Sequence, residues 1–181
     1  PDGLRPVSDA AHEANMRTLV WFETTRIAPR SGSTLLTEHP EWLLGDVEAV
    51  RNGTGGDLLL NIGIPEARDY LTRLIVDIME KENIDDYRED FNIDAWNFWC
   101  SGDTPDRIGV TEMKYVENFY KFWADIRKLF PDSFIDNCSG GGRRLDYKSA
   151  MLSFPMCQSD FACYSEYEEE CITLENMYLD D

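Results

Sequence analysis

Short apolar segments and longer amphipathic segments alternate along the chain. The short segments are bounded by turn residues, a pattern typical of buried strands. These predicted strands lie at 17–22, 85–90, 133–137 and 155–159. In the longer segments apolar residues recur at three- and four-residue steps, which predicts helices with one buried face. These helices are expected at 4–15, from Pro65 onward, at 111–130 and at 165–179.

Strands and helices that alternate in units of about 40 to 50 residues predict a single α/β domain built on a parallel sheet. Residues 23–64, between the first predicted strand and the Pro65 helix, have the pattern of a long loop. Polar residues gather where each strand ends, as they do at the active sites of (β/α)₈ barrels and doubly wound sheets. A doubly wound sheet would call for a phosphate-binding loop, and "SGGGRR" (139–144) fits no such spacing. We therefore expect a curved, barrel-type sheet.

The balance of charge narrows the possible partners. The 181 residues include 17 Lys and Arg against 35 Asp and Glu, a formal net charge of −18. Because phosphate binding needs a basic surface, we expect no nucleic acid and no anionic membrane as partner. No apolar run is long enough for a transmembrane helix, and the polar first residues do not resemble a signal peptide. The sequence begins without Met and is expected to be a piece of a longer chain, so a signal could lie upstream.

The cysteines bear on compartment and on metal binding. There are five, at positions 100, 138, 157, 163 and 171, and none forms a C-x-x-C pair. The odd number and the spacing argue against a disulfide framework and against a zinc site. Reduced thiols favour a cytoplasmic protein. We expect neither metal nor cofactor.

Candidate chemistry lies at the ends of two predicted strands. Arg88, Asp90 and Asn92 alternate along "YREDFN" and would share one face of a strand. With Asp160 they offer two carboxyls, which suits glycoside hydrolysis: one stabilises or attacks the sugar and the other protonates the leaving oxygen. Arg88 would keep Asp90 ionised, and desolvation would keep Asp160 protonated. The alternative is that both are solvated aspartates at strand ends.

Other residues allow two interpretations each. The glycines of "NCSGGGRR" (137–144) permit either close approach to a sugar or an ordinary tight turn. Trp21 and Trp42 could stack on a sugar ring or belong to the core. His12 and His39 have no partner at metal-ligand spacing and are expected at the surface.

Seven blocks of sequence occur in an order that resembles one known family. They are "LVWFE", "EHPEWLL", "LLLNIGIPEARDYL", "YREDFN", "GVTEMKYVENFYKFW", "IDNCSGGGRRLD" and "CQSDF". Together they resemble the catalytic barrel of the melibiase-type α-galactosidases of glycoside hydrolase family 36. The resemblance implies that residues 1–181 form part of one catalytic (β/α)₈ TIM barrel, roughly its third to sixth strands.

The resemblance also implies roles for individual residues. Asp90 would be the nucleophile and Asp160 the acid/base of a retaining enzyme that releases terminal α-linked galactose from oligosaccharides. The residues expected to bind the substrate are Trp21, Arg88, Asn92, Cys138 and Gly141. No metal or cofactor takes part in the implied reaction.

The chain departs from the family pattern in places, and alternatives stay open. Thr24 and Thr25 stand where the family has Pro and Glu, "QSDF" replaces "RSDY", and an upstream strand with an Asp-Asp pair is absent from this sequence. Related activities are an α-N-acetylgalactosaminidase or a galactosyltransferase of the same clan. A non-catalytic alternative is an inactive or sugar-binding barrel fragment. An oligomer is possible for the full-length parent.

Overall fold

A parallel sheet forms the centre of the fold. A computed structural model describes residues 3–29, 31–157 and 159–160, and the fold is that of these residues. The strands β1 (Leu19–Phe22), β5 (Asp86–Glu89) and β6 (Ile135–Asn137) are ordered β1-β5-β6 and run parallel. They confirm the first three predicted strands. Trp21 pairs with Arg88, and Arg88 with Asp136, across the three strands.

The fourth predicted strand is present as a shorter pairing. Met156 forms an isolated parallel bridge with Asn137. Backbone N–H groups of Phe154, Asn137 and Cys157 donate to Ile135, Pro155 and Asn137 at 2.8, 2.9 and 2.7 Å. The segment therefore extends the parallel pattern beyond β6, while residue 158 lies outside the described residues.

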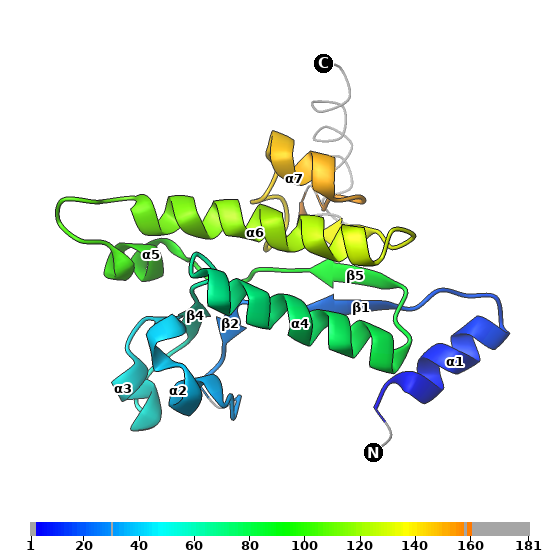
Figure 1. Ribbon diagram of the computed structural model, residues 1–181, viewed down its shortest axis with the longest axis horizontal. Coiled ribbons are helices and arrows are strands. Elements are labelled where there is room, and N and C mark those ends of the chain that lie inside the picture. The colour runs from blue at the N-terminus through cyan, green and yellow to red at the C-terminus, as the bar shows by residue number, and fades with distance from the viewer. Residues whose placement is uncertain (1–2, 30, 158, 161–181) are drawn as a thin grey trace.

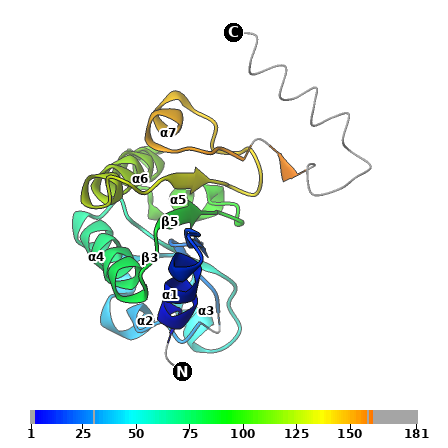
Figure 2. The ribbon, with the colours of Figure 1, turned by 90° about the vertical axis from the view of Figure 1, so that its right-hand side faces the viewer.

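Two long helices cover one face of this sheet. They are α4 (Pro65–Glu82) and α6 (Val110–Leu129), which lie together on one side of the strands (Figures 1 and 2). Pro65 occupies the first turn of α4, where its missing N–H costs nothing, and Asn83 ends the helix in a left-handed conformation. A shorter helix, α1 (Arg5–Glu13), precedes β1. These three helices confirm the predicted ones, whereas the helix predicted at 165–179 lies outside the described residues.

The core lies between these helices and the sheet. Tyr87 of β5 is fully buried, stacked on Phe22 at 5.3 Å between ring centroids and edge-on to Phe122 of α6 at 6.2 Å. On the opposite face of the sheet, Trp21 is 50% exposed. The sheet is thus packed on one face and open on the other among the described residues.

The prediction of a long loop at 23–64 was wrong. This segment folds into a second, antiparallel sheet ordered β2-β4-β3 and three short helical turns. Its elements are β2 (Arg26–Ile27), α2 (Leu35–Glu38), η1 (Pro40–Trp42), β3 (Leu43–Leu44), α3 (Val47–Arg51) and β4 (Leu58–Leu60). The strands have two or three residues each, too few to show a period in the sequence. The small sheet lies beyond the ends of β1 and β5, next to where polar residues were expected (Figure 1).

Two more short helices had no counterpart in the sequence prediction. They are α5 (Trp96–Gly102) and α7 (Tyr147–Leu152). Asp146 caps α7 by accepting from the N–H groups of Lys148 and Ser149. Among the described helices, none has both the length and the apolar character to cross a membrane.

Candidate active site

Asp90 follows the last residue of β5 and is held by a ring of donors. The Trp21 indole N–H donates to its Oδ2 at 3.1 Å, and the N–H groups of Gly140 and Phe91 donate to its Oδ1 at 3.0 and 2.7 Å. Burial acts to raise the pKa of Asp90, but hydrogen bonds from Gly140, Phe91, Asn92 and Trp21 outweigh it and lower the pKa to about 2. Asp90 is therefore ionised at neutral pH, as a nucleophilic carboxylate must be.

The prediction that Arg88 keeps Asp90 ionised was wrong. The guanidinium of Arg88 pairs with Asp136, its neighbour across the sheet on β6, at 2.5 Å. Backbone N–H groups and two neutral side chains, not Arg88, keep Asp90 ionised. The predicted direction of the pKa shift is nevertheless confirmed. Arg88 lies on the same face of β5 as Asp90, in line with Trp21 and Asp136.

The glycine turn after β6 lies between the two candidate acids. Gly140 and Gly141 have positive φ values of 51° and 84°, which residues with a side chain rarely adopt. The Gly140 N–H points at Asp90. A Cβ on Gly141 would lie 3.1 Å from the backbone N of Asp160 and 3.4 Å from its carboxylate. The turn therefore packs closely against both candidate acids, and close approach to a sugar stays a prediction.

The Cys138 thiol lies close to both Asp160 and Asp90. The Sγ atoms of Cys138 and Cys157 and a carboxylate oxygen of Asp160 all lie within 4.8 Å of one another. Cys138 also forms a side-chain hydrogen bond with Asp90, and burial raises the pKa of this thiol. The burial expected around Asp160 is not found among the described residues, where Asp160 is exposed. The structure thus brings Trp21, Asp90, Cys138 and Asp160 to one place.

Comparison with known proteins identifies the family. The model of the melibiase family matches residues 1–161. The chain belongs to the melibiase family.

Several relatives of this melibiase-family chain are named alpha-galactosidases. It is 28% identical over 160 residues to alpha-galactosidase Mel36A of Lactobacillus acidophilus, covering 88% of this chain and 22% of the relative. The solved alpha-galactosidase from Lactobacillus brevis superposes with a TM-score of 0.73 at 27% identity, over 88% of this chain and 21% of that chain. A variant of the family 36 alpha-galactosidase AgaA from Geobacillus stearothermophilus, solved with stachyose, superposes equally well at 23% identity, over 88% of this chain and 22% of that chain.

These comparisons confirm the resemblance to the α-galactosidases of glycoside hydrolase family 36 and the parallel α/β fold. This melibiase-family chain spans about a fifth of the length of the relatives that it matches. Its position at the third to sixth strands of a barrel stays a prediction.

The remaining residues considered in the sequence analysis lie in different parts of the fold. Asn92 is exposed, contributes a hydrogen bond to Asp90 and donates its backbone N–H to Glu23 at 2.6 Å. Trp42 stacks on His39 at 3.7 Å and packs against the core, away from the residues around Asp90. His12 bonds to Asp85 at 2.7 Å and is likewise remote from the site.

Sequence reasoning missed a buried polar group beneath the site. Glu89 is completely buried and accepts from the hydroxyl and the N–H of Thr24, at 2.8 and 3.3 Å. Burial raises the pKa of Glu89 to about 8. Tyr115 donates its hydroxyl to Thr25 at 2.7 Å. The two threonines, which set this chain apart from the family pattern, are therefore partners of buried groups.

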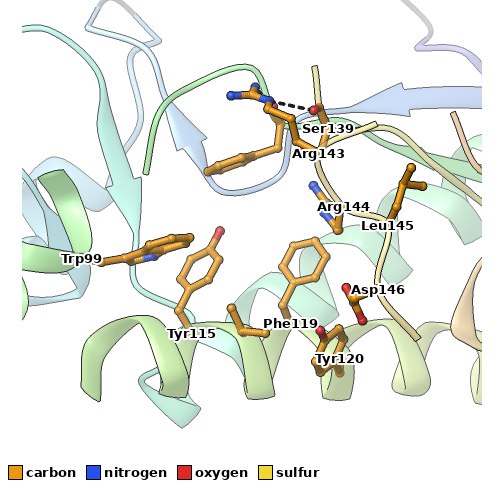
Figure 3. Close-up of a pocket in the computed structure, with 11 residues that line it drawn as sticks. Trp99, Tyr115, Phe119, Tyr120, Ser139, Arg143, Arg144, Leu145 and Asp146 are labelled. Atoms are coloured by element: carbon orange, nitrogen blue, oxygen red, sulfur yellow. Dashed lines mark hydrogen bonds between the residues drawn. The ribbon is translucent and has the colours of Figure 1, made fainter. Parts of the chain in front are cut away.

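A separate cavity lies on the helix side of the strand ends. It has a volume of about 270 Å³ and is bounded by α5, α6 and the segment 139–146 (Figure 3). Its walls are mainly aromatic, from Trp99, Tyr115 and Phe119, and the Arg144 guanidinium lies 4.5 Å from the centre of the Phe119 ring. Neither candidate acid lines it. Phe91, whose N–H donates to Asp90, does line the cavity, so the cavity adjoins the residues around Asp90.

Proposed function

We propose that this chain is the central part of a retaining α-galactosidase that hydrolyses terminal α-linked galactose from oligosaccharides. Membership of the melibiase family supports the proposal, as do relatives named alpha-galactosidases. Structures of related enzymes hold stachyose or raffinose, so we propose oligosaccharides of this kind as substrates. The observation that carries most weight in this chain is Asp90, ionised by hydrogen bonds and joined to Asp160 through Cys138.

In the proposed first step, Asp90 attacks the anomeric carbon of galactose. The bond from that carbon to the leaving oxygen breaks, and Asp160 gives its proton to this oxygen. The product is a galactosyl ester of Asp90. An ionised, hydrogen-bonded carboxylate is suited to this role, because it can attack without first losing a proton.

In the proposed second step, Asp160 acts as a base. It takes a proton from water, and the water oxygen attacks the anomeric carbon and releases Asp90. Two inversions give galactose with its original configuration. We expect Trp21 to bind the sugar, and its indole N–H, which points at Asp90, and its half-exposed surface support this role.

The test uses the full-length protein. Asp90→Ala should abolish turnover of nitrophenyl α-galactoside, and azide should restore it with a β-galactosyl azide as product. Asp160→Ala should spare the first step for substrates with good leaving groups, because these need no protonation. Asp77→Ala, an exposed aspartate on α4, is the matched control and should retain activity. Full activity of Asp90→Ala without azide would contradict the proposal.

A further inference from the structure

Two thiols and a carboxylate converge near Asp90, although Cys138 lies 19 and 22 residues before the other two, Cys157 and Asp160. Cys138 directly follows β6 and is 3% exposed, while Cys157 and Asp160 come from the segment beyond the last parallel bridge. Their donor atoms lie within 4.8 Å of one another, and the Cys157 Sγ is 4.0 Å from Oδ1 of Asp160. No closely spaced pair of cysteines, the usual sign of a zinc site, marks this group in the sequence.

We propose that Cys138, Cys157 and Asp160 bind a thiophilic divalent cation, with Zn²⁺ as the fitting ion. Zinc takes thiolate sulfur at about 2.3 Å and carboxylate oxygen at about 2.1 Å in tetrahedral geometry. Tetrahedral angles then place two sulfur ligands about 3.8 Å apart. The three donors lie within 4.8 Å of one another, so their separations exceed such values by at most about 1 Å.

The surroundings favour a bound cation. Binding converts both thiols to thiolates and releases two protons, while Asp160 contributes its carboxylate. The Asp90 carboxylate lies next to Cys138 and adds negative charge without being a ligand. Arg88 lies close enough to interact electrostatically with both cysteines, and its own charge is offset by Asp136. Three protein ligands leave the fourth tetrahedral position to water.

A cation at this position would inhibit the enzyme, an effect that rests on the proposed function. Asp160 bound to the metal is unable to protonate a leaving oxygen. The ion would also lie beside Asp90, where the anomeric carbon of the sugar has to approach. Zinc and substrate should therefore compete.

The test uses Co²⁺ as a spectroscopic probe in the reduced full-length protein. Cobalt bound to thiolates gives a charge-transfer band in the near ultraviolet, and Zn²⁺ should displace the cobalt and remove the band. Cys157→Ser should lose the band, and so should Asp160→Asn in part. Cys100→Ser is the matched control, because Cys100 is an exposed thiol outside this group, and it should keep the band. Circular dichroism checks that each variant is folded.

Two results would overturn the metal site: no cobalt band in the wild-type protein while its thiols titrate as free, or an unchanged band in Cys157→Ser. Hydrolysis of nitrophenyl α-galactoside is measured in parallel, and Zn²⁺ should inhibit the wild type and Cys100→Ser but not Cys157→Ser. A cobalt band in a protein that lacks α-galactosidase activity even in its metal-free form would contradict the proposed function and leave the metal site standing. α-Galactosidase activity in a protein that gives no cobalt band would contradict the metal site and leave the proposed function standing.

Discussion

The buried carboxyl of Glu89 makes the stability of the fold depend on pH, and Glu89→Gln should remove that dependence. Glu89 lies on the helix-covered face of β5, with no exposed surface and with Thr24 as its hydrogen-bond donor. Burial disfavours the ionised form, which is why the pKa is raised to about 8 from a reference of 4.5. Glutamine has the shape of the protonated acid and retains an acceptor for Thr24, but it cannot ionise.

The sign and size of the effect follow from linkage. In the unfolded chain Glu89 ionises near its reference pKa, whereas in the folded chain it holds its proton up to about pH 8. The unfolded state therefore binds fewer protons between these values, and the folded state loses stability as the pH rises through this range. Between about pH 5 and pH 8, the loss amounts to roughly 3 kcal/mol in the free energy of unfolding.

The assay is urea denaturation of the full-length protein, followed by tryptophan fluorescence at about pH 5 and about pH 8. Glu89→Gln should be close to the wild type at the lower pH and more stable by roughly 3 kcal/mol at the higher pH. Glu80→Gln makes the same chemical change at an exposed position of α4 and should leave the pH dependence of the wild type in place. Parallel curves for the wild type and Glu89→Gln would refute the reasoning. They would mean that Glu89 is ionised in the folded protein, with the nearby Arg144 balancing its charge.

Three further substitutions test the fold by the same denaturation assay. Gly141→Ala forces a side chain onto a φ of 84° and against the backbone N of Asp160, and should destabilise by about 1–2 kcal/mol. Tyr115→Phe removes the buried hydrogen bond from the Tyr115 hydroxyl to Thr25 and should destabilise the fold by about 1 kcal/mol. Leu59→Ala, in the middle of β4 with no exposed surface, should destabilise by about 2–5 kcal/mol. A variant whose urea denaturation midpoint equals that of the wild type would contradict the contact described for its residue.

Regular periodicity explains which parts of the fold were predictable. The stripe of α4 includes Leu71 and Ile75, which are 2% exposed, and a helix of 18 residues gives such a stripe room to repeat. The parallel strands were found because an apolar run and a polar strand end occur together. In the segment 23–64 the strands are two or three residues long, too short for such a run to be recognised as a strand. Their pairing depends on contacts between distant residues, which no local pattern reports.

The site was predictable in its residues but less so in its contacts. Strand alternation correctly placed Arg88 and Asp90 on one face, but the choice of ion-pair partner depends on which strand lies beside β5. Asp136 occupies the paired position on β6 and takes the guanidinium of Arg88. The N–H of Gly140 that helps to ionise Asp90 belongs to a turn whose backbone path is set by positive φ values. Neither a neighbouring strand nor a backbone N–H direction can be read from the residue types alone.

Glu89 and Asp90 show how strongly position outweighs residue type in this chain. The two carboxyls are adjacent in sequence, yet burial raises the pKa of Glu89 to about 8, while hydrogen bonds lower that of Asp90 to about 2. Glu89 points into the helix layer, where Thr24 is its only hydrogen-bond donor among the described residues. Asp90 comes after the strand has ended, where a glycine turn and an indole supply donors. A carboxylate that must attack a sugar therefore belongs at the end of the strand, and the same group one residue earlier would be held protonated and out of reach. This is the physical reason why, in a parallel sheet of this kind, candidate nucleophiles are to be sought just beyond the last paired residue of a strand.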